Sequence, residues 1–325
     1  MKRPLAVTLL ILATLAVVFA FGPREPVDET ITFDAATLGD DLDAYLAARE
    51  APLSALKPGA EKRIVWNNPA ARNRTPLSIV YLHGFSATSQ EVRPLPDLVA
   101  RTLGANLFYA RLTGHGQGGP AMATASANAW YNDVAEALAI ARSIGDRVVL
   151  LSTSTGGTLA TWAVTQQELA ADVIGTAMIS PNFAVQAAGA DALLLPWARQ
   201  LVPLVFGANR SFQPLNDGQA QWWTTSYPNL ALLPMQATVA HTARLPFEAI
   251  EVPALFIFHP EDQVVRSDVT EAVAARWGAN TSGDATILRV ESSGDPSNHV
   301  IAGDIMSPDT TAPLATAISD WIKPL

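Results

Sequence analysis

Short apolar runs along this chain alternate with segments of helical character. Residues 77–82 are nearly all apolar, as expected for a strand that is covered on both faces. Strands and helices that alternate repeatedly indicate an α/β fold class, with a doubly wound, mostly parallel sheet and helices on both faces. The predicted strands are residues 62–66, 77–82, 106–110, 147–151, 173–179, 253–258 and 285–290.

Helices are predicted between most of these strands. Residues 40–50 form an amphipathic pattern, with Leu42, Tyr45 and Leu46 on one side. Gly104 is a C-cap candidate for one later helix, and Gly145 ends another. The predicted helices are residues 40–50, 92–103, 127–144, a segment after residue 157 that continues to about 169, 267–277 and 311–322.

The N-terminus has the pattern of a targeting segment. Lys2 and Arg3 precede an apolar run over residues 5–21, at the short limit for spanning a bilayer. We therefore expect residues 1–26 to be a signal peptide or an N-terminal membrane anchor with a linker, and leave cleavage open. Because positive charge stays on the cytoplasmic side, the folded domain, residues 27–325, is expected to be exported to the periplasmic or extracellular side. Residues 5–21 would then be the part in contact with the membrane.

Residues 181–251 interrupt the alternation of strands and helices, and no clear strand is predicted there. The segment is rich in leucine and tryptophan and is broken by several prolines. Asp191, Arg199 and Arg210 make a membrane span implausible. An inserted cap of short helices over an apolar pocket fits best, and a small satellite core is the alternative.

Composition excludes several classes of function. The net charge of −9 argues against a nucleic-acid partner, because proteins that bind nucleic acids present basic patches. The chain has no cysteine, which excludes disulfides, thiolate nucleophiles and cysteine-based zinc sites. His259, Glu261 and Asp262 lie close together in sequence, but no second histidine is spaced for a metal site. We therefore predict no metal.

Ser154 stands at the junction between a predicted strand and a predicted helix. The apolar residues 148–151 lead into this junction, and Gly156 and Gly157 allow the following helix to pack closely. A serine in such a turn is held with its hydroxyl pointing out of the sheet. Ser154 is thus the predicted nucleophile, whereas Ser152, before the apex, is expected to pack against backbone.

A nucleophilic serine needs a base and a group that orients the base. Asp262 follows the predicted strand that ends at Phe258, and we favour it over Glu261 as the orienting acid. His299 is the one histidine that follows Asp262 in the chain, so it is the predicted base if the order is serine, acid, histidine.

Two further loops follow predicted strands. In His83-Gly84-Phe85 the glycine permits a sharp turn, and the N–H groups of Phe85 and Thr155 are predicted to form an oxyanion hole, while His83 holds the loop by hydrogen bonding. The glycine-rich loop around His115 is expected to shape the pocket wall. It lacks the lysine and Ser/Thr of a nucleotide loop, and no helix is predicted to start at its last glycine, Gly119.

The order and spacing of these motifs resemble the α/β-hydrolase superfamily over about residues 62–325. The cap and the sequence Gly114-His115-Gly116 resemble the branch of monoacylglycerol lipases and carboxylesterases, which includes serine-aminopeptidase-type hydrolase domains. The resemblance implies a Ser154–Asp262–His299 mechanism through an acyl-enzyme, without a cofactor. One position departs from the family pattern, because Ser152 stands where the nucleophile turn usually has its first glycine.

These observations lead to the hypothesis of an exported serine esterase whose substrates are small-molecule carboxylic esters with apolar acyl chains. Two alternatives remain open. The departure at Ser152 motivates a non-catalytic member that binds an apolar ligand or a partner under its cap. A thioesterase, amidase or polyester hydrolase would use the same three residues.

Overall fold

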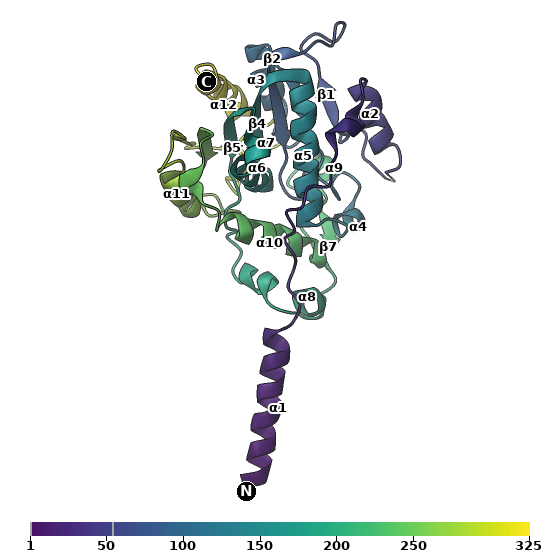
Figure 1. The fold of residues 1–325 in the computed structure, drawn as a ribbon, viewed down its shortest axis with the longest axis vertical. Helices are drawn as coiled ribbons and strands as arrows, with labels where there is room; N and C mark the ends of the chain where they lie inside the picture. Colours follow the sequence, from purple (N-terminus) through teal and green to yellow (C-terminus); the bar gives the residue numbers. More distant parts are fainter. Residues whose placement is uncertain (1, 54) are drawn as a thin grey trace.

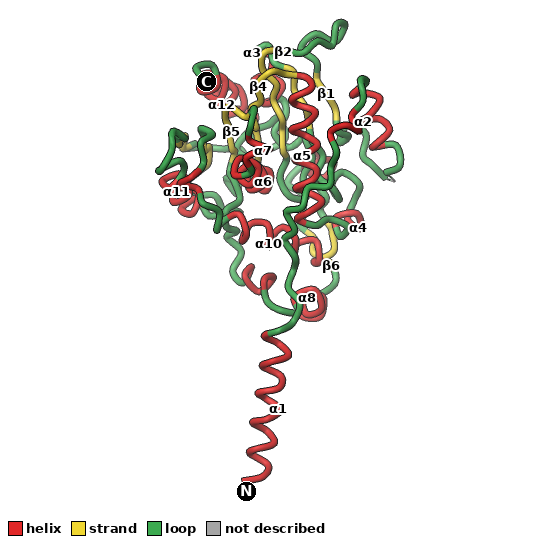
Figure 2. The backbone as a smooth tube through the Cα atoms, viewed as in Figure 1, coloured by secondary structure: helices red, strands yellow, loops and turns green. Residues whose placement is uncertain are grey.

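The computed structural model describes residues 2–53 and 55–325, and in this part of the chain seven strands form one twisted sheet (Figures 1 and 2). The strand order is β1-β3-β2-β4-β5-β8-β9, and all neighbouring strands are parallel except β1 and β3. The predicted fold class is confirmed. The strands are β1 (Arg63–Val65), β2 (Thr75–Leu82), β3 (Asn106–Tyr109), β4 (Gly145–Thr153), β5 (Val173–Ile179), β8 (Ala254–Phe258) and β9 (Ala285–Arg289).

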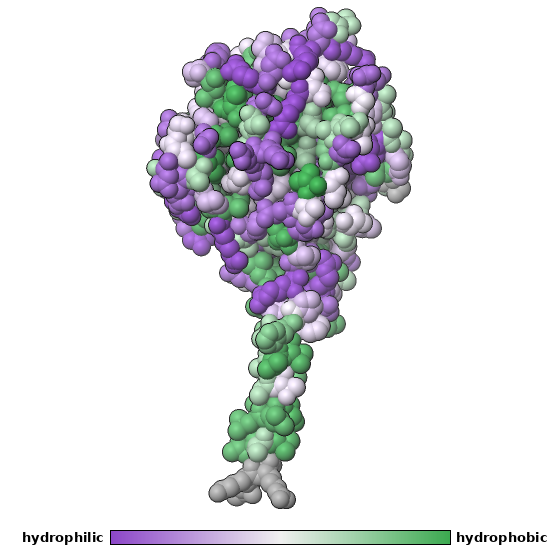
Figure 3. All heavy atoms as spheres, in the orientation of Figure 1, coloured by the Kyte–Doolittle hydropathy of each residue, from purple (hydrophilic) through white to green (hydrophobic). Residues whose placement is uncertain are grey.

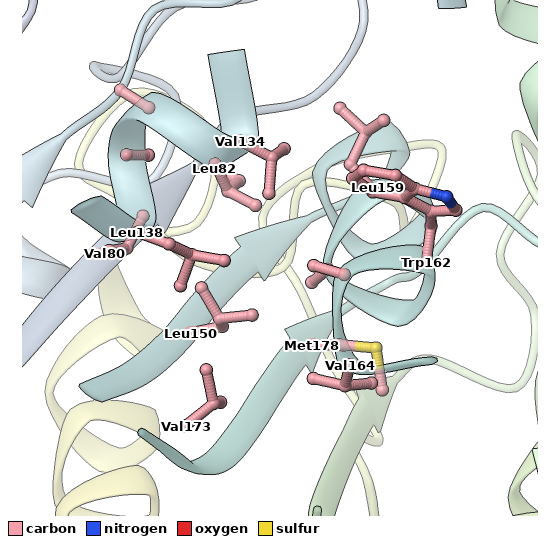
Figure 4. Packing of buried hydrophobic residues seen from close by; sticks show 14 of the residues in the cluster. Val80, Leu82, Val134, Leu138, Leu150, Leu159, Trp162, Val164, Val173 and Met178 are labelled. Atoms are coloured by element: carbon pink, nitrogen blue, oxygen red, sulfur yellow. The ribbon is translucent and has the colours of Figure 1, made fainter. Parts of the chain in front are cut away.

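Helices cover both faces of the sheet because the central strands are apolar on both sides. Along β2, Val80 and Leu82 face a core formed with α5 (Ala127–Ile144) and α6 (Thr155–Thr165), which Figure 4 shows from close by. Ile79 and Tyr81 point the opposite way, into a second core formed with α3 (Leu95–Leu103) and α12 (Pro308–Ile322). This alternation follows from the period of two in a strand, and it buries the strand completely.

Several predicted helices agree with the structure, and α5 has the predicted bounds. The helices are α1 (Lys2–Ala20), α2 (Leu42–Glu50), α3 (Leu95–Leu103), α4 (Gly119–Met122), α5 (Ala127–Ile144), α6 (Thr155–Thr165), α7 (Gln167–Ala170), α8 (Ala198–Phe206), α9 (Asp217–Trp222), α10 (Leu232–Thr242), α11 (Ser267–Arg276) and α12 (Pro308–Ile322), with 3₁₀ helices η1 (Ala35–Leu38), η2 (Ala190–Leu194), η3 (Asn229–Ala231) and η4 (Phe247–Ala249).

Several of the helix predictions differ from the structure. The helix predicted from residue 92 begins only at Leu95, after Pro94, which lacks the N–H that a helix interior uses. The helix predicted to continue to about residue 169 is interrupted at Gln166, whose backbone is extended. A short helix does begin at Gly119, where none was predicted, because Pro120 in its first turn has a backbone angle suited to a helix start.

The segment between β5 and β8 contains η2 to η4, α8 to α10 and two short strands. The strands, β6 (Asn209–Ser211) and β7 (Ser226–Pro228), form an antiparallel pair, so the prediction that this segment lacks strands is wrong. The sequence did not predict this pair, because each strand has only three residues and neither shows the alternation of apolar and polar residues that indicates a strand.

Helix α1 projects away from the rest of the molecule (Figure 1), and its side chains from Leu5 onward are exposed and mostly apolar (Figure 3). Its C-terminal end contacts Trp197, whose indole N–H donates to the carbonyl of Val18 at 3.0 Å and whose backbone N–H donates to Pro23 at 2.8 Å. Among the residues searched, which are those the structure describes, no helix combines the length and apolarity needed to cross a membrane.

Candidate active site

Ser154 occupies the sharp turn between β4 and α6. Its φ of +53° and ψ of −118° lie in a region that residues other than glycine rarely adopt. Backbone hydrogen bonds hold the turn: the Ser154 N–H donates to Ile179 at 2.9 Å, and the Ser154 carbonyl accepts from Gly157 at 2.8 Å and from Asn182 at 3.0 Å. The strained turn keeps the serine at the carboxyl end of the sheet, where its side chain borders a cavity.

The residues beside Ser154 explain how this turn packs. A β-carbon on Gly156 would lie 2.1 Å from the carbonyl oxygen of Leu82, so only glycine fits there. Ser152 is fully buried, and its Oγ lies 3.5 Å from the carbonyl oxygen of Ala177. A serine thus fits where the family pattern has a glycine, and it leaves the geometry of the turn intact.

Three side chains from distant parts of the chain meet at this turn. The Nε2 atom of His299 lies 3.0 Å from Ser154 Oγ, and its Nδ1 atom lies 2.8 Å from Asp262 Oδ2. The other carboxylate oxygen of Asp262 accepts from the N–H groups of Val264 and Val265. A carboxylate beside Nδ1 favours the tautomer with hydrogen on Nδ1, which leaves Nε2 free to accept the proton of the serine hydroxyl.

A second carboxylate, Asp295, holds the loop that carries His299. It accepts hydrogen bonds from the backbone N–H groups of Ser297, His299 and Val300 and from the Ser297 hydroxyl, at 2.8 to 3.2 Å. Sequence reasoning missed this role. Only the Asp-Pro-Ser sequence hinted at it, because aspartate often accepts from the backbone two residues ahead in such turns.

The surroundings of His299 favour its protonated form. Burial on its own lowers the pKa of the imidazole, but the carboxylates of Asp262, Asp295 and Glu91 together raise the pKa of His299 above its usual value. A raised pKa suits a group that must take a proton from a hydroxyl and hold it during a reaction.

Phe85 and Thr155, whose backbone N–H groups are the predicted oxyanion donors, line the same cavity as Ser154. Neither N–H donates a hydrogen bond to any residue that the structure describes. The loop of Phe85 lies against the serine turn, since a β-carbon on Gly84 would be 3.2 Å from the β-carbon of Ser154. Two free N–H groups beside a hydroxyl form the arrangement that can hold an oxyanion.

His83 and His115 are both fully buried behind this loop. His83 accepts a hydrogen bond from the N–H of Leu112, and His115 accepts one from the N–H of Ser86. Burial lowers the pKa of His83 well below its usual value and that of His115 to about 4, so both rings are neutral at physiological pH. His115 is not among the residues that line the cavity: Phe85 packs over it, and His115 supports the loop of Phe85 and Ser86, which do line the cavity.

The cavity beside Ser154 has a volume of about 600 Å³ and is roofed by the segment between β5 and β8. Aliphatic and aromatic side chains dominate the lining from that segment: Leu193, Val202, Phe206, Phe212, Leu232 and Met235. A larger cavity of about 760 Å³ lies near the start of β5 and contains none of the predicted site residues.

The sequence profile of a family described as the alpha/beta hydrolase family matches residues 79–309, well over half of the chain. The chain belongs to this family. The resemblance inferred from the sequence motifs is therefore confirmed. No curated protein sequence matches the chain.

Several solved structures share the fold. A structure from work on the metagenome-derived lipolytic enzymes LipS and LipT has 21% identity and a TM-score of 0.66, and the match covers 83% of this chain and 100% of the other. The monoacylglycerol lipase of Paleococcus ferrophilus has 17% identity and a TM-score of 0.55, covering 80% and 96%. A soluble variant of the Saccharomyces cerevisiae monoglyceride lipase has 11% identity and a TM-score of 0.60, covering 81% and 90%.

Within this alpha/beta hydrolase, sequence reasoning located Ser154, Asp262 and His299, and the structure brings all three together. It did not single out Glu91, a fully buried carboxyl group beneath the same loops. Nothing in the local sequence around Glu91 sets it apart from an ordinary surface glutamate.

Proposed function

We propose that the protein is a serine hydrolase that cleaves carboxylic esters with apolar acyl chains. The hydrogen-bonded chain from Ser154 through His299 to Asp262, at the edge of an apolar cavity, carries this proposal. A serine hydroxyl alone is a poor nucleophile, and this arrangement supplies both the base and the group that orients it.

In the first half of the reaction, Ser154 Oγ attacks the carbonyl carbon of the ester while His299 Nε2 takes the hydroxyl proton. The negative charge that develops on the carbonyl oxygen is held by the N–H groups of Phe85 and Thr155. As the tetrahedral intermediate collapses, its bond to the alcohol breaks, and His299 returns the proton to the leaving alkoxide. The products are a free alcohol and an acyl group bound to Ser154.

In the second half, a water molecule attacks the acyl carbon and gives its proton to His299 Nε2. The bond between the acyl carbon and Ser154 Oγ then breaks, and His299 protonates the serine oxygen. A carboxylic acid leaves, and the hydroxyl of Ser154 is restored. Asp262 stabilises the imidazolium in both halves but keeps its own charge.

The lining of the cavity favours an apolar acyl chain. Leu193, Val202 and Leu232 offer aliphatic surface, and each buried CH₂ of a substrate gains roughly 0.8 kcal/mol from such contacts. Two of the similar folds are lipases of monoacylglycerols or monoglycerides, which agrees with this class of substrate. Esters of medium-chain acids are therefore the substrates to test first.

The proposal is tested with p-nitrophenyl esters of graded acyl length and with a fluorophosphonate probe, which labels only activated serines. The Ser154→Ala variant should lose both turnover and labelling. Ser152→Ala is the matched control, because it removes a buried hydroxyl of the same turn and should keep both. Equal turnover by the wild type and Ser154→Ala would rule out the assignment.

We also propose that the apolar helix α1 contacts lipid and that the folded domain lies outside the cytoplasm. The exposed apolar side chains from Leu5 to Phe21 support lipid contact, and the basic residues at positions 2 and 3 support this orientation. A reporter fused after Phe21 should be active only outside the cytoplasm. Replacing Leu9 and Leu12 by lysine should return the reporter to the cytoplasm, and an active cytoplasmic reporter on the unmodified segment would contradict the proposal.

A further inference from the structure

Glu91 is a buried carboxyl group that the proposed reaction does not use. It lies in the turns between β2 and α3 and is 2% exposed. One oxygen, Oε1, accepts from the backbone N–H of Gly84 at 2.6 Å and from the hydroxyl of Tyr81 at 2.7 Å. No lysine or arginine forms an ion pair with it in the part of the chain that the structure describes. Burying a carboxyl group without a cation is costly, so its position calls for a physical reason.

The contacts of Glu91 reach both loops that surround the reacting atoms. Gly84 directly precedes Phe85, whose N–H belongs to the predicted oxyanion hole. The Tyr81 hydroxyl lies 2.9 Å from Thr153 Oγ1, and Thr153 directly precedes Ser154. Since Tyr81 donates to Glu91, Thr153 donates to Tyr81. One carboxylate oxygen therefore connects the backbone of the oxyanion loop with the strand end that carries the nucleophile.

The packing around Gly84 shows how tight this connection is. A β-carbon on Gly84 would lie 3.0 Å from Glu91 Oε2 and 3.2 Å from the β-carbon of Ser154. Gly84 is thus packed closely against both Glu91 and Ser154. A shift of the carboxyl group would move the oxyanion loop relative to the serine, and misplacements of about 1 Å cost on the order of 100-fold in rate.

Glu91 also acts on His299 through its charge. Burial raises the pKa of Glu91 to about 7, although the hydrogen bonds from Tyr81 and Gly84 and the nearby His299 all oppose that rise. When ionised, Glu91 joins Asp262 and Asp295 in raising the pKa of His299. The nearest arginine in sequence, Arg93, pairs with Asp97 instead.

We propose that Glu91 is a positioning residue for this site: its carboxyl group fixes the oxyanion loop against the serine turn, and its charge acts on His299 from this position. The inference rests on the proposed function, because it assigns a role in the same reaction. The Glu91 side chain has two separate effects, one through its hydrogen bonds and one through its charge. Two different substitutions of Glu91 can distinguish these effects.

The first test concerns geometry. Glu91→Ala removes the acceptor, and we expect kcat to fall roughly 10- to 100-fold with KM within about twofold. Glu91→Gln keeps a carbonyl oxygen for Gly84 and Tyr81 and should restore most of kcat. If the alanine variant does not fold, Tyr81→Phe breaks the link to Thr153 without opening a cavity and should lower kcat several-fold.

The second test concerns charge. In the wild type, Glu91 and His299 titrate together, so the acid limb of the kcat/KM profile reflects a coupled pair. In Glu91→Gln the imidazolium loses a stabilising negative charge, so the pKa of His299 falls. The acid limb should then fit a single ionisation and move to lower pH by about half a unit or more. The downfield Nδ1 proton of His299, followed by proton NMR without any substrate, should show the same displacement.

Asp97→Asn is the matched control, because Asp97 is a carboxylate of the same region that accepts from Arg93 and from the hydroxyl of Tyr109, away from the cavity. It should leave kcat and the His299 midpoint unchanged. A Glu91→Gln enzyme with the wild-type midpoint, or a folded Glu91→Ala enzyme with the wild-type kcat, would overturn the proposal. A wild type that neither hydrolyses esters nor reacts with the probe, yet shows the NMR displacement in Glu91→Gln, would instead refute the proposed function alone.

Discussion

The carbonyl oxygen of Leu82 lies only 2.1 Å from the place where a β-carbon on Gly156 would stand. The end of β2 and the first turn of α6 therefore touch backbone to backbone. Because β2 leads into the loop of Phe85 and α6 follows Ser154, this contact fixes Phe85 and Ser154 relative to each other.

The first prediction follows from this contact. Gly156→Ala should lower the free energy of unfolding by at least about 3 kcal/mol, because the methyl group meets rigid backbone and cannot be accommodated by a rotamer change. Urea unfolding followed by circular dichroism measures the loss. Gly104→Ala is the control: its φ is +63° but a β-carbon there meets nothing within 4 Å, so it should cost only about 1–2 kcal/mol. Equal losses in the two variants would contradict the role of the close contact.

The second prediction concerns the acid that orients His299. In Asp262→Asn, the amide oxygen would accept from Val264 and Val265, so the amide nitrogen would face Nδ1 and favour the wrong imidazole tautomer. We expect kcat to drop by about 10³- to 10⁴-fold with little loss of stability. Steady-state kinetics together with a thermal melt check both statements. Asp268→Asn, an exposed carboxylate near the same loop that pairs with Arg266, should keep full activity.

Much of this site could be predicted because its polar side chains lie in the loops that follow predicted strands. Ser154 comes directly after β4 and Asp262 lies in the loop that follows β8, and parallel strands bring their carboxyl ends to one edge of the sheet. Chain order singled out His299. The structure also places Asp262 rather than the exposed Glu261 beside the imidazole. These residues could be predicted because the local sequence and the topology of the sheet both constrain their positions.

The sequence did not predict the structural roles of Glu91, Asp295 and His115. Each is a polar side chain whose role depends on which backbone groups the tertiary fold brings to it. Glu91 accepts from Gly84 seven residues earlier, whereas His115 accepts from Ser86 on another loop. The antiparallel pair of β6 and β7 was not predicted for a related reason. These two short strands are defined by their hydrogen-bonded pairing in the folded chain and not by a pattern in their local sequence.

The third prediction concerns acid stability. His115 remains neutral in the folded state, with a pKa of about 4, whereas the unfolded chain takes up a proton near pH 6.5. The unfolded state therefore binds more protons between these values, and the stability that neutral His115 provides is lost as the pH falls through this window.

His115→Gln keeps an acceptor for the N–H of Ser86 but does not titrate. Relative to the wild type, this variant should gain on the order of 2–3 kcal/mol in free energy of unfolding between pH 7.5 and pH 4.5. Urea unfolding at the two pH values measures the change. A difference between variant and wild type that stays constant with pH would show that His115 is not held neutral.

The fourth prediction concerns the acyl chain. Val202 on α8 is 4% exposed and lines the cavity, so Val202→Phe should fill part of the space that a long acyl chain would occupy. A single methylene group more or less in an apolar pocket already changes discrimination between substrates by about 10- to 200-fold. We expect kcat/KM to fall by about 10-fold or more for long-chain esters and to stay near the wild-type value for acetyl esters.

Leu204→Phe, on the same helix but 81% exposed and outside the cavity, should leave the whole chain-length profile unchanged. If Val202→Phe instead lowered kcat/KM equally for all esters, the acyl chain would have to lie elsewhere, and the alcohol side of the substrate would be the part that meets α8.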